Sequence, residues 1–127
     1  MMNDVRYTRD HGWVCIDDDG IATIGITDYA QEQLGDIVYV QMPEIGRDLV
    51  QSEECILIES VKTTGEVKSP IGGRVIEVNE LLTEQPEKVN ESALDDGWLV
   101  RLEPADEEEL EDLMDADDYE DYVSGLA

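Results

Sequence analysis

Short runs of β-branched and aliphatic residues, each bounded by turn-forming residues, constrain the fold of this chain most strongly. They predict strands of ordinary length. The expected strands are residues 12–16, 21–26, 36–42, 55–60, 65–69, 74–78 and 98–102. Short strands at such close spacing indicate a mainly β fold in which sheet faces enclose one core. The segment "DDDG" at 17–20 predicts a hairpin turn, because aspartate tolerates turn geometry and glycine adopts positive φ.

Two segments between the strands predict short helices at the periphery. Residues 27–35, "TDYAQEQLG", read as one helix. Thr27 can cap its first turn and Gly35 can end it. The long connection at 79–92 is expected to contain a turn of helix after Pro86, because proline suits the first helical position.

The acidic segment after residue 103 is expected to be helical and to pack against the sheets. Leu110, Leu113 and Met114 form one apolar helix face, and Asp106 and Glu109 stand in capping-box positions. A second helix is expected near Asp115, and it brings three more side chains inward: Tyr119, Tyr122 and Val123. With 127 residues the chain is the size of one domain. We expect a single domain over 1–127, with its core at about 5–103 and the acidic helical segment at 104–123.

The charge of the chain excludes several classes of partner. The formal net charge is -25, with 33 acidic residues against 8 lysines and arginines. Nucleic acid and anionic membranes would repel such a surface. The hydrophobic content of 41% nevertheless argues for a folded core rather than disorder. Two interpretations stand open: a protein adapted to a salt-rich cytoplasm, where counterions screen the charge, or an acidic protein of an ordinary cell.

Targeting and site motifs are sparse. The sequence contains no apolar stretch near the length of a membrane span and no signal-peptide core, so we expect a soluble cytoplasmic protein. Cys15 and Cys55 lie far apart without a CxxC spacing, and the chain has one histidine. This pattern favours buried thiols over a disulfide framework or a zinc site. No Ser-His-Asp set, phosphate loop or metal cluster supports catalysis, so we expect no enzyme and no metal.

Lysine is scarce, which draws attention to the setting of each one: Lys62, Lys68 and Lys88. Lys62 follows an apolar strand, and "KSPIGG" supplies a turn and a returning strand after it. Lys62 is therefore expected at the end of a hairpin, where its amine is accessible to another protein. The alternative is ordinary solubilising charge, which is our interpretation of Lys68 and Lys88.

The hairpin and its surroundings resemble a known family. "ESVK", followed by "SPIGGRVIEVN", is similar to the lipoyl-attachment hairpin of the glycine cleavage system H proteins. "GITDYAQEQLGDIVYVQMPEIG", "NESALDDGW" and the acidic helical C-terminus resemble the same family in the same order, over roughly residues 5–123. The resemblance implies a barrel-sandwich hybrid with short peripheral helices and a C-terminal helix. Biotin carriers usually place methionines beside the lysine, whereas this chain has Val61 and Thr63.

The resemblance implies a lipoylated carrier rather than an enzyme. Lys62 would carry lipoate in amide linkage, and Glu59, Ser60 and Val61 would help the lipoylating enzyme to recognise it. The partners would be the pyridoxal-phosphate glycine decarboxylase, the tetrahydrofolate-dependent aminomethyltransferase and dihydrolipoamide dehydrogenase. Two alternatives stand beside this one: a related protein that relays or donates lipoate, and an unmodified acidic interaction module.

One motif departs from the family pattern. The family's "HEW" reads "HGW" here, so Gly12 removes the acidic residue that would meet the amine of the loaded arm. Glu66 and Asp10 are candidates to replace it, and His11 is a third arm-docking candidate. His11 and Trp13 also have structural interpretations, the first as a group that satisfies backbone partners and the second as a core residue.

Overall fold

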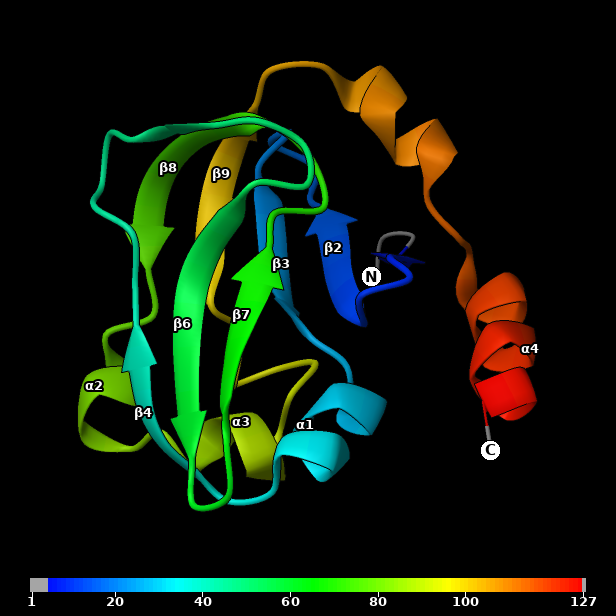
Figure 1. The fold of residues 1–127 in the computed structure, drawn as a ribbon. Coiled ribbons are helices and arrows are strands. Elements are labelled where there is room, and N and C mark those ends of the chain that lie inside the picture. Colours follow the sequence, from blue (N-terminus) through cyan, green and yellow to red (C-terminus); the bar gives the residue numbers. More distant parts are fainter. Residues whose placement is uncertain (1–4, 127) are drawn as a thin grey trace.

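Two antiparallel sheets enclose one core in the computed structural model, which describes residues 5–126 (Figure 1). The larger sheet has the strand order β1-β2-β3-β9-β8-β5, and the smaller has the order β4-β6-β7. The strands of the larger sheet are β1 (Val5–Tyr7), β2 (Gly12–Ile16), β3 (Ala22–Ile26), β9 (Val100–Pro104), β8 (Gly73–Val78) and β5 (Asp48–Leu49). Those of the smaller sheet are β4 (Ile37–Gln41), β6 (Glu54–Ser60) and β7 (Thr64–Lys68).

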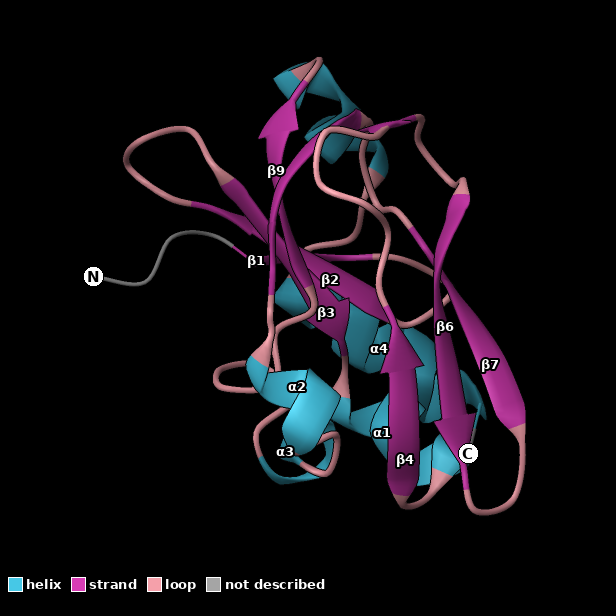
Figure 2. Cartoon of the chain, turned by 90° about the vertical axis from the view of Figure 1, so that its left-hand side faces the viewer, coloured by secondary structure: helices cyan, strands magenta, loops and turns pink. Residues whose placement is uncertain are grey.

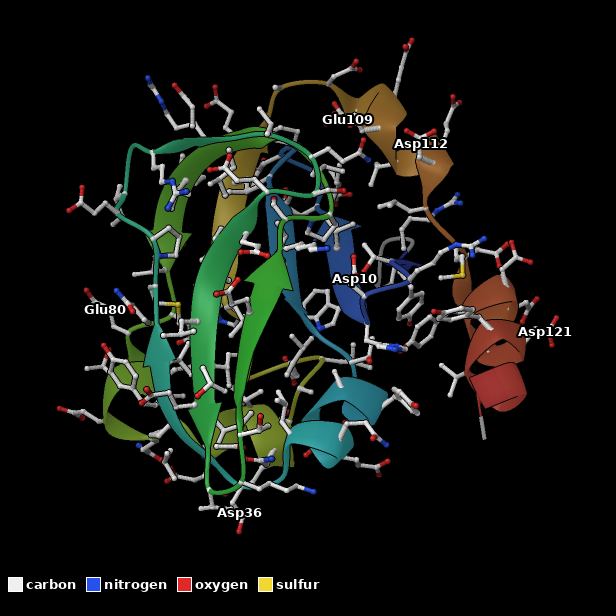
Figure 3. All side chains as sticks on the ribbon, in the orientation of Figure 1. Asp10, Asp36, Glu80, Glu109, Asp112 and Asp121 are labelled. Atoms are coloured by element: carbon white, nitrogen blue, oxygen red, sulfur yellow. The ribbon has the colours of Figure 1, made fainter. Side chains whose placement is uncertain are left out.

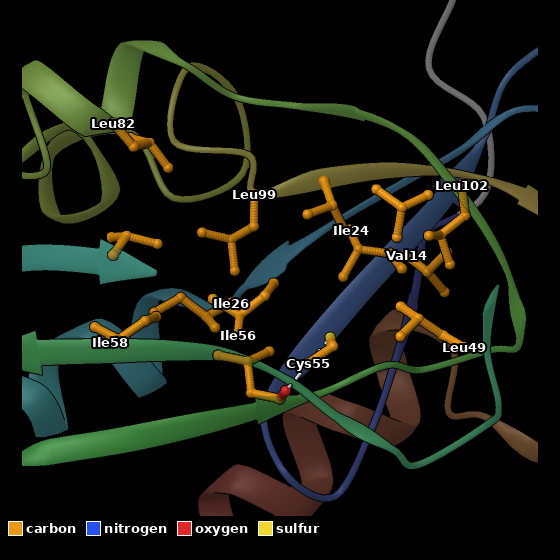
Figure 4. Packing of buried hydrophobic residues seen from close by; sticks show 14 of the residues in the cluster. Val14, Ile24, Ile26, Leu49, Cys55, Ile56, Ile58, Leu82, Leu99 and Leu102 are labelled. Carbon is orange, nitrogen blue, oxygen red and sulfur yellow. Dashed lines mark hydrogen bonds between the residues drawn. The ribbon is translucent and has the colours of Figure 1, made fainter. Parts of the chain in front are cut away.

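Side chains from both sheets meet in a single apolar core (Figure 4). Val14, Ile24 and Leu102 of the larger sheet are fully buried, as is Ile58 of the smaller sheet. Burying each such side chain stabilises the fold by about 1.5 to 3 kcal/mol. The predicted barrel-sandwich arrangement is confirmed, and the expected hairpin at 17–20 joins β2 to β3 with Gly20 at φ 81°.

Three short helices close one end of the barrel, at the end that also carries the turn between β6 and β7 (Figures 1 and 2). They are α1 (Asp28–Leu34), α2 (Leu81–Glu84) and α3 (Lys88–Glu91). The Thr27 hydroxyl accepts the backbone N–H of Ala30 at 3.3 Å, and Gly35 ends α1, as expected. The helical turn after Pro86 is confirmed as α3. The sequence did not indicate α2, whose single turn is held by the burial of Leu82.

The acidic segment after β9 folds differently from the expectation. It begins as a 3₁₀ helix, η1 (Glu107–Asp112). Asp106 caps η1 by accepting the Glu108 N–H at 2.9 Å, but Glu109 accepts the backbone N–H of Gly72 at 2.8 Å. The predicted capping box is therefore wrong, because the Glu109 carboxylate binds a neighbouring loop instead of its own helix start.

The predicted helix face is also wrong at Leu113, whose backbone is extended, and at Met114. Backbone hydrogen bonds of 2.8 and 2.9 Å join Met114 to Tyr7, so this residue extends the edge of β1 and cannot be helical. The second helix is correct: α4 (Ala116–Leu126) starts after Asp115 and stands beside β1 (Figure 1). Tyr119 is buried and Tyr122 half-buried, as the pattern predicted.

The remaining differences concern very short strands and one thiol. β1 and β5 were not predicted, because runs of two or three residues carry no readable periodicity. Cys15 is half-buried rather than buried. Cys55 is buried as expected, donates to the Val67 carbonyl at 3.6 Å, and has its thiol pKa raised by burial to about 11.

Carboxylates cover the molecule on all the sides that Figure 3 shows. Within residues 5–126, ion pairs join Arg47 to Glu53, Lys68 to Asp10, Arg74 to Asp48, Lys88 to Glu91 and Arg101 to Glu77. Because the chain has 33 acidic residues and only 8 lysines and arginines, most carboxylates have no cation to pair with. None of the helices described is long and apolar enough to span a membrane.

Candidate functional site

Lys62 lies at the tip of the hairpin formed by β6 and β7. Ser60 closes the turn: its backbone N–H donates to the Thr63 carbonyl at 2.8 Å, and its hydroxyl donates to the same carbonyl at 3.1 Å. The Ser60 hydroxyl also accepts the N–H groups of Lys62 and Thr63, at 3.3 and 3.1 Å. Ser60 therefore has a structural role at the turn. Val61, Lys62 and Thr63 are all exposed.

The segment that follows α1 contacts both the turn and the stem of Lys62. The N–H of Val61 donates to the Asp36 carbonyl at 3.0 Å. A Cβ atom added at Gly35 would lie 2.7 Å from Lys62 Cε, so the lysine stem runs directly over this glycine. Gly35 also has φ of 79°, in the left-handed region that other residues adopt only under strain. Glycine at position 35 therefore allows α1 to end there and leaves room for the stem of Lys62.

Asn90 of α3 hydrogen-bonds to the segment that contacts the turn. Its Nδ2 donates to Gln31 Oε1 at 2.9 Å and to the Gly35 carbonyl at 2.8 Å, while its Oδ1 accepts the N–H of Ile37 at 2.9 Å. The side chain thus joins the end of α1 to the start of β4. Sequence reasoning missed Asn90, because its partners lie 53 to 59 positions away and no local pattern marks the residue.

A cleft of about 190 Å³ opens between α1, the β1–β2 turn and the β6–β7 hairpin. Its apolar lining includes Ile26, Leu34 and Ile58, and its polar lining includes Asp10, His11 and Glu66. Leu34 precedes the glycine under the Lys62 stem, so the cleft begins beside that stem. The structure therefore brings all three predicted arm-docking candidates together.

The two carboxylates of the cleft have different surroundings. The side chain of Asp10 is 59% exposed, and its Oδ2 lies 4.0 Å from Lys68 Nζ. An exposed ion pair at this distance contributes little to the stability of the fold. Glu66 is exposed on β7, and its pKa is raised by the neighbouring Glu54, which hydrogen-bonds to it and repels its negative charge. Asp10 therefore faces a lysine at the edge of the cleft, whereas the Glu66 carboxyl is shared between the cleft and its hydrogen bond to Glu54.

His11 is held in an unusual backbone conformation, with φ of 68°. Its N–H donates to the Thr8 carbonyl at 3.1 Å and its carbonyl accepts the N–H of Thr27 at 3.0 Å. The imidazole packs 4.5 Å from the Tyr29 ring, and its Nδ1 lies 2.9 Å from the Tyr119 hydroxyl. Burial lowers the pKa of His11, and Asp10 offsets part of this effect.

The remaining residues of the "HGW" motif are structural. Trp13 is 4% exposed and its indole N–H donates to the Ala93 carbonyl at 3.1 Å, which confirms its interpretation as a core residue. Gly12 is buried, but a Cβ atom there would meet nothing closer than Thr8 Oγ1 at 3.4 Å. The first atom of a side chain at position 12 therefore fits.

The other two lysines lie away from the tip. Lys68 is at the opposite end of β7 from the turn, and Lys88 is 3.3 Å from Glu91 on the same helix. Among residues 5–126, no three histidine, cysteine, aspartate or glutamate side chains stand together as a metal site.

Comparisons with known proteins agree on one family. The sequence profile of the family described as "Glycine cleavage H-protein" matches residues 5–125. The chain is 51% identical to the glycine cleavage system H protein of Parvibaculum lavamentivorans, over 98% of this chain and 99% of that protein. It is 49% identical to the corresponding protein of Rhodospirillum rubrum, over the same shares.

A solved structure gives the same result. The crystal structure of a glycine cleavage system H protein from Mycobacterium marinum superposes with a TM-score of 0.83 at 32% sequence identity. The match covers 99% of this chain and 98% of that one.

Proposed function

This chain belongs to the glycine cleavage H-protein family and is a lipoyl carrier component of the glycine cleavage system, and on that premise we propose that Lys62 is its attachment site. The observation that carries this proposal is the position of Lys62 on an exposed turn that hydrogen bonds of its neighbours hold rigid. A rigid turn presents the amine in one orientation to every enzyme that must reach it.

The residues around Lys62 fit the addition of a lipoyl group. The lysine is exposed, so an acyl group on Nζ meets no steric obstacle from the core. Lipoate, when bound, supplies the sulfurs that take up and release the aminomethyl group, and the protein supplies their position. Glu59, at the exposed end of β6, and Val61, 69% exposed, stand beside the lysine where a lipoylating enzyme would contact them.

We further assign to the cleft the role of docking the lipoyl arm. The cleft begins beside the Lys62 stem, and its lining of Ile26, Leu34 and Ile58 suits an aliphatic chain. Asp10 and Glu66 place negative charge at the same cleft, where they attract the cationic amine of the cargo. Docking there would shield the loaded arm from water.

The partners we propose are the pyridoxal-phosphate glycine decarboxylase, the tetrahydrofolate-dependent aminomethyltransferase, dihydrolipoamide dehydrogenase and a lipoylating enzyme. Each must approach the tip of the hairpin. Exposed apolar side chains next to the tip, Val38, Tyr39 and Val61, offer contact area for such approaches. They are 53%, 49% and 69% exposed.

Peptide mapping of protein purified from its native host tests the attachment site. We expect lipoate, or its octanoyl precursor, on Lys62 and none on Lys68 or Lys88. The intact mass of the same sample measures how much of the protein is modified. A fully unmodified protein would remove the proposal and favour an acidic interaction module, and modification at another lysine would refute the assignment of Lys62.

Gly12 favours a second candidate, a protein that relays or donates lipoate, because such a carrier needs no acidic partner for a loaded amine. Decay of the loaded arm distinguishes the two. If Glu66 protects the amine, Glu66→Gln should accelerate the spontaneous release of ammonia and formaldehyde from the loaded protein, and Gly12→Glu should change it little. If no carboxylate fills the role, Gly12→Glu should slow release about fivefold, which corresponds to about 1 kcal/mol for one partly buried ion pair.

Asp10→Asn completes this series, since Asp10 is the other carboxylate of the cleft. Glu77→Gln serves as the control, because Glu77 pairs with Arg101 on the larger sheet and does not line the cleft. Should none of the three cleft substitutions alter the decay, carboxylate protection is the wrong mechanism, and the relay function gains support.

A further inference from the structure

The C-terminal helix packs two tyrosines against His11 in the wall of the arm-docking cleft, and Tyr119 is the one that hydrogen-bonds to it. Tyr119 of α4 is 9% exposed, and its ring stacks on that of Tyr7 at 4.6 Å. Its hydroxyl lies 2.9 Å from His11 Nδ1 and 2.7 Å from Thr27 Oγ1. Tyr119 therefore joins a wall residue of the cleft to the cap of α1, the helix that forms another wall.

The donors and acceptors around the Tyr119 hydroxyl determine whether His11 Nδ1 carries a hydrogen. The backbone N–H of Ala30 donates to Thr27 Oγ1, which leaves the Thr27 hydroxyl hydrogen for Tyr119. The Tyr119 hydroxyl hydrogen is then available to His11 Nδ1, which must be an unprotonated acceptor. Every group in this chain of hydrogen bonds is satisfied when His11 is neutral and carries its hydrogen on Nε2.

The opposite direction leaves one group without a partner. If His11 Nδ1 donated to Tyr119, the Tyr119 and Thr27 hydroxyls would have only the hydrogen bond between them left, so the hydrogen of one hydroxyl would have no acceptor. Thr27 is 3% exposed, and its hydrogen bonds within residues 5–126 offer no other acceptor for its hydroxyl hydrogen. An unpaired buried hydroxyl is costly, so the neutral form of His11 is favoured.

Packing holds His11 in this arrangement against its backbone preference. A left-handed φ for a residue other than glycine is unfavourable and persists only where the surroundings enforce it. The enforcing contacts come from two helices: Tyr29 of α1 at 4.5 Å and Tyr119 and Tyr122 of α4 at 5.9 and 5.8 Å between ring centroids.

We propose that Tyr119 is a positioning residue that fixes His11 as the neutral Nε2–H tautomer in the cleft wall, so that α4 completes the arm-docking site. The inference rests on the proposed docking of the lipoyl arm in this cleft. A neutral imidazole does not compete with the cationic amine for Asp10 or Glu66, whereas an imidazolium would repel that amine and compete for both carboxylates.

The charges around His11 are consistent with this role. The titratable and charged groups that face it or its immediate neighbours are Asp10, Tyr29, Glu66, Tyr119, Tyr122, Lys68 beside Asp10, and Arg9 over the Tyr122 ring. Two of them are carboxylates that would favour an imidazolium. The pKa of His11 is nevertheless lowered, because burial outweighs the charge of Asp10.

The single histidine of the chain makes the test direct, since ¹⁵N NMR of histidine-labelled protein reports His11 alone. We expect the wild-type protein near pH 7 to show the Nε2–H tautomer. Tyr119→Phe keeps the ring stacked on Tyr7 but removes the hydroxyl. In this variant we expect a mixture of tautomers and a rise in the pKa of His11 toward the ordinary value of about 6.5, because the neutral form loses its donor.

Tyr122→Phe is the matched control. Tyr122 lies on the same helix and also packs against His11, but its hydroxyl donates to the Arg9 carbonyl at 3.2 Å. We expect it to leave the His11 tautomer unchanged. A wild-type protein in the Nδ1–H tautomer overturns the proposal even if Tyr119→Phe does not fold, and so does an unchanged tautomer in folded Tyr119→Phe.

Methyl NMR of Leu34 and Ile58, compared between the lipoylated and unlipoylated proteins, tests the link to docking. We expect lipoylation to shift these signals in the wild-type protein and to shift them less in Tyr119→Phe. Equal shifts in both proteins would overturn the role of α4 in the site. Absence of any shift in the wild-type protein would instead refute docking in the cleft, while the tautomer experiment would still decide whether Tyr119 positions His11.

Discussion

Replacing Lys62 with arginine is expected to abolish glycine cleavage in a reconstituted system and to leave the fold intact. Arginine keeps the positive charge and a long stem that can lie over Gly35. Its guanidinium, however, stays protonated and cannot be acylated as a neutral amine can. The turn itself depends on backbone groups and the Ser60 hydroxyl, so we expect a change of no more than about 0.5 kcal/mol in the free energy of unfolding.

The measurement is glycine-dependent release of carbon dioxide and ammonia with the partner enzymes present, together with a thermal melt. Lys68→Arg and Lys88→Arg are the controls, because both lysines are partly exposed and lie away from the hairpin tip. They should retain the wild-type rate. Full glycine cleavage by Lys62→Arg would contradict the assignment of the attachment site.

The second large effect concerns salt. With a net charge of -25 and few cations to pair with the carboxylates, the folded surface repels itself. Molar salt shortens the screening length to about 3 Å and should remove most of this repulsion. We expect the melting temperature to rise by roughly 10 °C or more between low salt and molar KCl, since each kcal/mol corresponds to about 3 to 5 °C in a domain of this size.

A variant with fewer charges separates screening from other effects of salt. Glu111, Glu120 and Asp121 are exposed carboxylates of the C-terminal segment. Replacing them with glutamine, glutamine and asparagine should raise the melting temperature at low salt and flatten its dependence on KCl. A wild-type melting temperature that is insensitive to salt would remove the case for adaptation to a salt-rich cytoplasm.

Acidification should partly reproduce the effect of salt. The pKa of Glu66 is raised in the folded protein, so its contribution to stability is present at low pH and is lost as pH rises through that pKa. His11 acts in the opposite sense, because its lowered pKa stabilises the fold above about pH 6.5 and this contribution is lost as pH falls. We therefore expect a small decrease in melting temperature below about pH 6.5, and then an increase as the carboxylates become protonated near pH 4 to 5.

The sequence by itself determined those features whose causes lie within a few residues. Alternating apolar runs predicted most of the strands, and Thr27 and Gly35 predicted both ends of α1. The turn at 17–20 followed from turn-forming residues, and the placement of Lys62 at a hairpin tip followed from the apolar strand before it and the strand after it. Each of these depends on backbone preferences and hydrogen bonds between near neighbours, which a short stretch of sequence contains completely.

Only the tertiary structure decided how the site is assembled. Glu109 had a local partner in the capping-box pattern, yet its carboxylate binds Gly72, which lies 37 positions away. Met114 pairs with the edge of β1 instead of continuing a helix. Asn90 and the contact of Tyr119 with His11, 108 positions apart, have no local signal at all. The packing of two sheets chose these partners, because a polar group buried by that packing takes whichever partner the packing brings near, whatever its separation along the chain.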